Sequence, residues 1–135
     1  MKEITKLIVN SYRIKKLGYD FMGYTFVSPT DLSYHHLLEK SDGGEESLEN
    51  GVALVRKTSH DYLHIIEKYD KEIFKRITEE IVKEKDKGFI DIENIKIINN
   101  LLLLFESKHS DDTFKNGKLI LRDSYKKRIL TMKNL

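Results

Sequence analysis

The 135-residue sequence contains no cysteine, no tryptophan and a single proline, and its apolar runs are short. Without cysteine, neither disulfide bonds nor a thiolate zinc site can stabilise the fold, so a metal ion would have to be bound by His, Asp or Glu. The longest apolar run covers residues 101–105, whereas a helix that crosses a bilayer needs about 20 apolar residues. Charged side chains also occupy the first positions, where a secretion signal has an apolar core, so we expect a cytoplasmic protein without membrane contact.

The composition is that of a globular protein, with 39% hydrophobic and 34% charged residues, and its length predicts a single domain, 1–135. The net charge is only +2, but the chain from residue 115 onward contains seven Lys or Arg and one Asp. We expect this basic C-terminal tail (109–135) to contact nucleic acid, although a solvated tail explains the same charges equally well. The residues expected to make the contact are Lys126, Lys127 and Arg128.

Apolar spacing and turn residues predict the elements of the first half of the chain. A helix, an extended segment and two short strands are expected over residues 3–17, 19–27, 32–38 and 52–55. Gly18 suits the end of the helix. Glycines at 43 and 44 predict a turn after the first strand, and Asn50-Gly51 predicts a second one in which Gly51 supplies a positive φ.

The second half reads as helical. Thr58 or Ser59 is a credible N-cap for a helix that begins near His60. Its expected core stripe is Tyr62, Ile65, Ile66 and Tyr69. Two more helices are expected over 70–87, ended by Gly88, and over 91–108, capped by Asp91.

The order of these elements predicts an α+β fold in which a β-hairpin and the helix after it, a ββα unit, are embedded in a mostly helical single domain. The expected parts are an N-terminal helix and extended segment, the ββα module, two packing helices and the basic tail, at 1–30, 31–69, 70–108 and 109–135.

Four of the five histidines lie between residues 35 and 64, and their spacing indicates a shared site. His60 and His64 are four residues apart on an expected helix, so both imidazoles lie on one face and can bind one metal ion. His35 and His36 are adjacent on an expected strand and point to opposite faces. This suits a division of labour in which one imidazole binds the ion and the other accepts a proton.

A single histidine is more often a packing or surface residue than a ligand, and we interpret His109 in that way. The four together favour a site, because chance placement would have to explain both the adjacent pair and the helical spacing. A purely structural metal site is the alternative.

The run SYHHLLEKSDGGEESLENGVALVRKTSHDYLH resembles the HNH (ββα-metal, His-Me finger) endonucleases. The pattern of that family is a His pair ending a strand, a Gly-rich loop, an Asn, a short strand, and a helix with metal-binding His. The match covers residues 31–67, about a quarter of the chain, and its spacing is similar to the colicin-type nuclease module. The chain departs from many members in lacking a Cys-x-x-Cys pair, since Arg56 and Ser59 occupy those places.

The resemblance implies a role for each matching residue. His36 would be the general base, and His35, His60 and His64 would bind one divalent metal ion, either Zn, Ni, Mg or Mn. Asn50 would match the central Asn, which orients the base or ties the loop, and a plain turn residue before a glycine is the alternative for it.

The function that follows from the resemblance is hydrolysis of DNA phosphodiester bonds, with a homodimer as a possible assembly. Arg56 and Lys57 would hold flanking phosphates, although ordinary solvated charges explain them as well. One rival is a catalytically inactive, metal-stabilised module that binds nucleic acid or joins an assembly. A second rival is a zinc protease, because His60 to His64 is similar to H-E-x-x-H, but Asp61 is one methylene shorter than the Glu of that motif.

Overall fold

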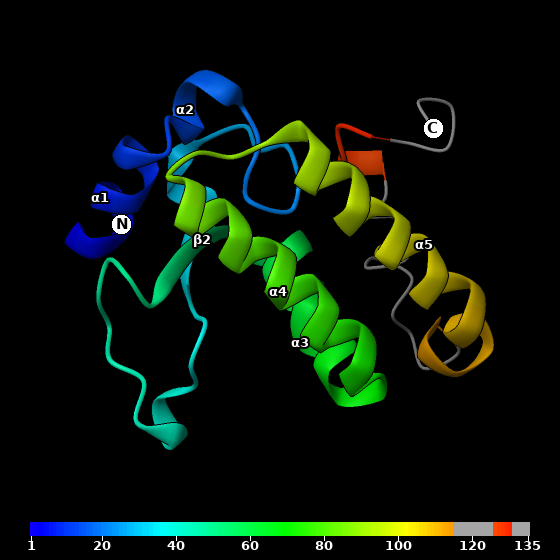
Figure 1. Cartoon of the computed structure of the whole chain (residues 1–135). Helices are drawn as coiled ribbons and strands as arrows, with labels where there is room; N and C mark the ends of the chain where they lie inside the picture. Colours follow the sequence, from blue (N-terminus) through cyan, green and yellow to red (C-terminus); the bar gives the residue numbers. More distant parts are fainter. Residues whose placement is uncertain (115–125, 131–135) are drawn as a thin grey trace.

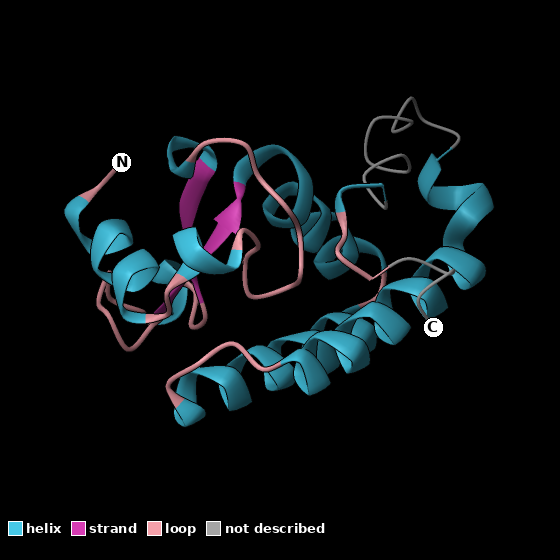
Figure 2. Ribbon diagram, turned by 90° about the horizontal axis from the view of Figure 1, so that it is seen from above, coloured by secondary structure: helices cyan, strands magenta, loops and turns pink. Residues whose placement is uncertain are grey.

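The computed structural model describes the backbone of residues 1–114 and 126–130, and the side chains of 1–109 and 126–130 (Figure 1). Its elements along the chain are α1 (Glu3–Ser11), α2 (Ile14–Leu17), the 3-10 turn η1 (Pro29–Asp31), β1 (Leu32–His36), the 3-10 turn η2 (Lys40–Asp42), β2 (Gly51–Val55), the π-helical turn η3 (Arg56–His60), α3 (Asp61–Tyr69), α4 (Lys71–Lys87) and α5 (Ile92–Phe114). The predicted α+β class is confirmed. Figure 2 shows how small the two-stranded sheet is beside the long helices.

β1 and β2 pair antiparallel with Tyr34 opposite Ala53 and His36 opposite Gly51. The expected first strand was longer, 32–38, but the ladder ends at His36 because the chain then enters the loop. Leu37 N–H still donates to the Asn50 carbonyl, at 2.8 Å. The second strand agrees with its prediction to within one residue.

Gly51 is required for a different reason from the one predicted. Its φ is not positive, so the expected left-handed turn at this residue is wrong. Instead, the Tyr34 ring lies directly over it, and a Cβ built on Gly51 would lie only 2.1 Å from that ring. Glycine here allows the close approach of Tyr34 rather than a special backbone conformation.

The N-terminal helix is interrupted where the sequence predicted continuity over 3–17. Arg13 adopts a left-handed conformation with φ 55°, which separates α1 from α2. Gly18 ends α2 with φ 80°, as predicted. The expected extended segment 19–27 forms a tight turn in which Tyr19 and Thr25 make an isolated β-bridge.

The start of the third helix also differs from the prediction. Helical backbone begins at Arg56, as a π-helical turn, and continues into α3. Neither Thr58 nor Ser59 acts as an N-cap. Ser59 is fully buried, and its hydroxyl bonds to the side chain of Asp20, which is also fully buried. A distant acceptor therefore replaced the local role that the sequence indicated.

α4 and α5 form an antiparallel helical hairpin whose ends agree with the sequence. Asp70 Oδ1 accepts from Ile73 N–H at 3.1 Å, Gly88 ends α4 with φ 80°, and Asp91 Oδ1 accepts from Glu93 N–H at 3.0 Å. α5 extends past the predicted end, but its backbone leaves helical geometry at His109 (φ −124°). The hairpin contributes a buried apolar face, made of Ile73, Ile77, Ile81, Ile95, Ile98, Leu101, Leu102 and Phe105.

Part of the C-terminal tail packs against the N-terminal turn. Thr25 N–H donates to the Lys127 carbonyl at 2.7 Å, and Ile129 N–H donates to the Gly23 carbonyl at 2.8 Å. The rest of the predicted tail from 115 onward lies outside the described residues.

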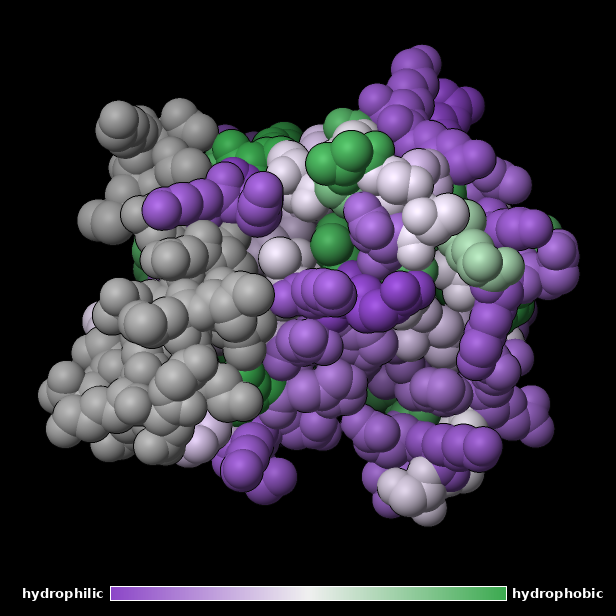
Figure 3. All heavy atoms as spheres, turned by 180° about the vertical axis from the view of Figure 1, so that it is seen from behind, coloured by the Kyte–Doolittle hydropathy of each residue, from purple (hydrophilic) through white to green (hydrophobic). Residues whose placement is uncertain are grey.

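The exposed face in Figure 3 is mainly hydrophilic, and its hydrophobic side chains form small separate patches. Within the described residues, none of the helices combines the length and the apolar character needed to span a bilayer.

Candidate metal centre

Three imidazoles from three successive elements converge at one place. His35 comes from β1, His60 from the last position of η3 and His64 from α3. Their ring centroids are 5.1 Å (His35 to His60), 5.4 Å (His35 to His64) and 4.9 Å (His60 to His64) apart. One nitrogen of each ring lies within 4.8 Å of one nitrogen of both others. The three histidines that the sequence assigned to one ion therefore lie together.

The strand alternation explains which side chains face this cluster. Ser33 and His35 point to the α3 side of β1, because side chains two residues apart share a face. Ser33 Oγ lies 2.6 Å from His60 Nδ1, and Glu67 Oε1 lies 3.4 Å from His64 Nδ1. With Nδ1 occupied by a hydrogen-bond partner in both rings, Nε2 is the nitrogen available to a metal ion, as is usual for outer-shell support of histidine ligands.

Burial keeps two of these imidazoles neutral. Burial, reinforced by the neighbouring imidazoles, lowers the pKa of His35 to about 3, and His35 is only 3% exposed. Burial also lowers the pKa of His60 to about 4, with further contributions from His64 and Arg56. A neutral imidazole offers a lone pair to a cation, so these two rings remain competent ligands well below neutral pH.

The cluster fits a divalent transition metal by its donor set. Zinc binds imidazole nitrogen at about 2.0 to 2.1 Å, so two nitrogens on one ion lie at most about 4.2 Å apart. The observed limit of 4.8 Å requires only a small inward rotation, and His64, with 47% of its side chain exposed, is free to make it. The cluster contains imidazoles only, and imidazole suits Zn, Ni, Cu and Fe.

His36 lies outside the cluster, on the opposite face of β1. Its ring packs edge-on against Tyr34, with centroids 4.8 Å apart, and it is half-buried. It is nevertheless close enough to contribute to the lowered pKa of both His35 and His60. The fourth imidazole is thus a neighbour of the cluster and not a fourth member of it.

Asn50 ties the loop between the strands to itself. Its Oδ1 accepts from Leu38 N–H at 2.7 Å, and its Nδ2 donates to the carbonyls of Leu38 at 3.0 Å and Glu45 at 2.8 Å. Both ends of the loop are therefore held next to the end of β1, where His36 lies. This geometry is the loop-tying role of the two roles that the resemblance implies for Asn50.

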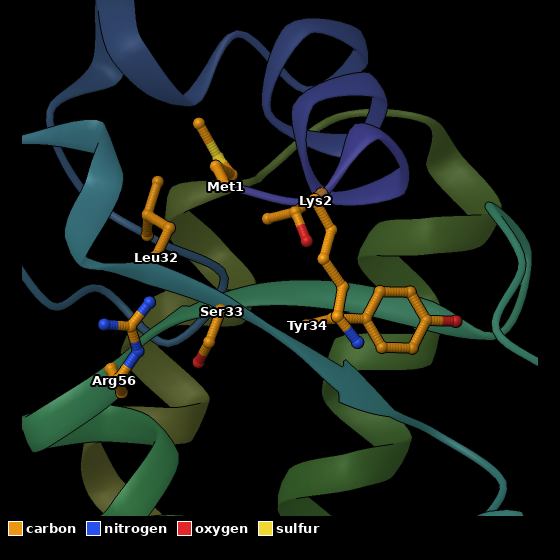
Figure 4. Close-up of a pocket in the computed structure, with 7 residues that line it drawn as sticks. Met1, Lys2, Leu32, Ser33, Tyr34 and Arg56 are labelled. Carbon is orange, nitrogen blue, oxygen red and sulfur yellow. The ribbon is translucent and has the colours of Figure 1, made fainter.

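Arg56 separates two hollows at the edge of β1. One, of about 320 Å³, is lined by Lys2, Leu32, Ser33 and Tyr34 among others, and Figure 4 shows these side chains around it. The other, of about 230 Å³, is lined by Asp31, Val55, Arg56 and Lys57. Arg56 and Lys57 are both exposed and border the metal cluster through His60.

The tail residues predicted to contact nucleic acid divide into two groups. Lys126 and Lys127 are exposed. Arg128 is buried, and its Nη2 donates to Glu106 Oε1 at 3.1 Å, so the prediction that Arg128 contacts nucleic acid is wrong for this conformation. The sequence offers no sign of this burial because Glu106 lies 22 residues away.

His109 is a packing residue, as interpreted from the sequence. Its Nε2 lies 2.8 Å from Asp70 Oδ2, and its ring stacks on Phe105. It joins the end of α5 to the start of α4 and takes no part in the metal cluster.

Two residues that support the cluster were missed in the sequence. Ser33 could have been found, since it precedes His35 by two residues and so shares its face of the strand. Asp20 gave no local signal, because its partner Ser59 is 39 residues away.

Comparison of the chain with protein-family models, with curated proteins and with solved structures gives no match.

Proposed function

We propose that the protein is a metal-dependent endonuclease of the HNH type that hydrolyses phosphodiester bonds in DNA. The observation that carries the proposal is the convergence of His35, His60 and His64 from a β-hairpin and the helix that follows it. The adjacent His36 and the loop tie of Asn50 support it, since both occur in the order that the resemblance implies.

The metal ligands would be His35, His60 and His64. A divalent cation bound there would supply Lewis-acid stabilisation of the negative charge that develops on the phosphate oxygens. Three neutral imidazoles favour Zn or Ni for tight binding, while Mg or Mn are candidates for turnover.

His36 would accept a proton from the attacking water. The water oxygen forms a bond to phosphorus while the bond from phosphorus to the 3′ oxygen breaks, and that oxygen then takes a proton from solvent. The products carry 5′-phosphate and 3′-hydroxyl ends. Arg56 and Lys57 would bind the flanking phosphates without reading the base sequence.

Replacing His36 by Ala tests the proposal. Plasmid cleavage would be measured with Zn, Ni, Mg and Mn, and metal affinity by titration of the same samples. We expect cleavage to fall at least about 100-fold, as for loss of a general base, with metal affinity unchanged within about threefold. His109→Ala is the matched control, because it removes an imidazole outside the cluster.

The outcomes separate the alternatives. If His36→Ala cleaves at the parental rate, the mechanism is wrong. If the parent retards DNA but cleaves it with none of the four ions, the inactive binding module is correct. Digestion of casein without nicking of plasmid would support the zinc protease instead.

A further inference from the structure

We propose that Asp20 is a positioning residue of the candidate metal centre, which holds η3 in the place from which His60 faces His35 and His64. The inference rests on the metal centre of the proposed function and does not depend on cleavage. Asp20 lies 40 residues before His60 in the chain and has no contact with an imidazole among the hydrogen bonds of its carboxylate.

One carboxylate oxygen of Asp20 fixes the residue within its own turn. Oδ1 accepts from Met22 N–H at 2.9 Å and from Tyr24 N–H at 3.0 Å. The same turn is held from outside, since the Gly23 carbonyl accepts from Ile129 N–H, and Gly23 lies against the Ile95 side chain of α5. Asp20 is therefore anchored to the core before it reaches the metal centre.

The other oxygen holds η3 at both of its ends. Oδ2 accepts from Val55 N–H at 2.8 Å and from the Ser59 hydroxyl. Val55 immediately precedes the turn, and Ser59 immediately precedes His60. A single oxygen atom thus sets the position of the backbone that carries the imidazole.

The local conformation gives a reason for this external support. η3 is a π-helical turn, a rare form that is stable only where its surroundings favour it and that is frequent at functional sites. Its first amide, Val55 N–H, is buried and would lack an acceptor without Asp20 or Ser59. A buried carboxylate costs free energy, which the four donors around Asp20 offset.

The ring and the backbone of His60 are held by different residues. Ser33 Oγ holds the ring through Nδ1, whereas Asp20 and Ser59 hold the backbone. Because Asp20 reaches His60 through Ser59, removing either residue should weaken the centre in the same way. Their effects should therefore not add.

The test uses the full chain as Asp20→Asn, Ser59→Ala and the double variant, with Co²⁺ as the probe. Asn would turn an N–H₂ group toward Val55 N–H, so the support of the turn is lost. We expect Co²⁺ affinity to fall roughly 10-fold to 100-fold in each single variant, as for other outer-shell residues, with a change in the visible Co²⁺ spectrum. The double variant should bind about as weakly as Asp20→Asn alone.

Ile98→Val is the control for general destabilisation, because Ile98 is fully buried in α5 and far along the chain from the cluster. It should lower the melting temperature by a few degrees, about 2 to 8 °C, and leave the Co²⁺ affinity and spectrum unchanged. A purely structural role for Asp20 would instead make the Asp20 variants behave like this control.

A second measurement does not need a metal ion. Ring contacts between His60 and His35, whose centroids are 5.1 Å apart, are measured by NMR in the metal-free protein. We expect these contacts to be lost in Ser59→Ala while those between Phe105 and His109 persist. If Asp20→Asn does not fold, Ser59→Ala decides the question, because it leaves the other bonds of Asp20 in place.

Parental Co²⁺ affinity and parental ring contacts in the variants would overturn the inference. Additive losses in the double variant would overturn the route through Ser59. A parent that binds Co²⁺ but cleaves no DNA would refute the proposed function alone, and a parent that binds no Co²⁺ leaves the ring contacts to decide the positioning role.

Discussion

The two helix starts on either side of α3 are stabilised in different ways. α4 begins after Asp70, whose side chain accepts from an amide three residues later. η3 begins after Val55, whose amide is bound by Asp20 from 35 residues upstream. The helical hairpin of α4 and α5 therefore forms its ends from local contacts, whereas the ββα region depends on the rest of the chain. The candidate site lies in the region that cannot form alone.

The largest expected effect is loss of the metal centre in His35→Ala. His35 is the most buried of the three imidazoles, and its removal leaves two ligands. We expect Zn²⁺ affinity, measured by competition with a chelating dye, to fall by more than about 100-fold, beyond the effect of an outer-shell change.

His36→Ala is the matched control for that variant, because it removes the adjacent imidazole on the other face of β1. Equal Zn²⁺ affinity in His35→Ala and the parent would mean that the three rings do not share an ion.

The second prediction concerns the hairpin. Leu102 is fully buried in α5, so Leu102→Ala should lower the free energy of unfolding by about 2 to 5 kcal/mol, measured by urea denaturation. Zn²⁺ affinity should stay within about threefold of the parent at temperatures where the variant is folded. A large drop in affinity would show that the two regions are coupled, against the comparison above.

The third prediction is a pH dependence that originates in the hairpin. Burial raises the pKa of Glu84 to about 9, so the folded chain holds a proton that the unfolded chain releases above its ordinary pKa. Stability is therefore lost as the pH rises from the ordinary value toward 9. Glu84→Gln should remove this loss and raise the free energy of unfolding at pH 8 by on the order of 2 kcal/mol relative to its effect at pH 4.

Glu79→Gln is the control for this measurement, since Glu79 is exposed on the same helix. It should change stability by similar small amounts at both pH values. If Glu84→Gln shows no more pH dependence than Glu79→Gln, the raised pKa of Glu84 is refuted.

The smallest expected effect is in the loop between the strands. Asn50→Ala removes three hydrogen bonds that are partly open to water, so we expect a loss of about 1 kcal/mol in the free energy of unfolding and faster proteolysis between residues 39 and 49. Glu49→Ala, at the exposed neighbouring position, should change neither. Unchanged proteolysis in Asn50→Ala would contradict the loop-tying role.

Much of the fold was predictable from local patterns. The hairpin, the helix after it and both long helices lie within a few residues of their predicted bounds, because apolar periodicity and caps act over three or four residues. The four histidines were also readable, since strand alternation and helical spacing relate His35 to His36 and His60 to His64. The break at Arg13 and the π-helical start at Arg56 were not, because the backbone there is set by tertiary contacts.

By itself, the sequence determined the α+β order, the ends of α4 and the faces on which its histidines lie, since each depends on residues close together in the chain. Only the tertiary structure decided that Ser59 bonds to Asp20 instead of capping a helix, and that Arg128 is buried against Glu106 instead of exposed. Both outcomes depend on a charged side chain finding its partner after 22 residues or more of intervening chain have packed. No periodicity in a sequence encodes such a meeting, because it is the apolar core that brings the partners together.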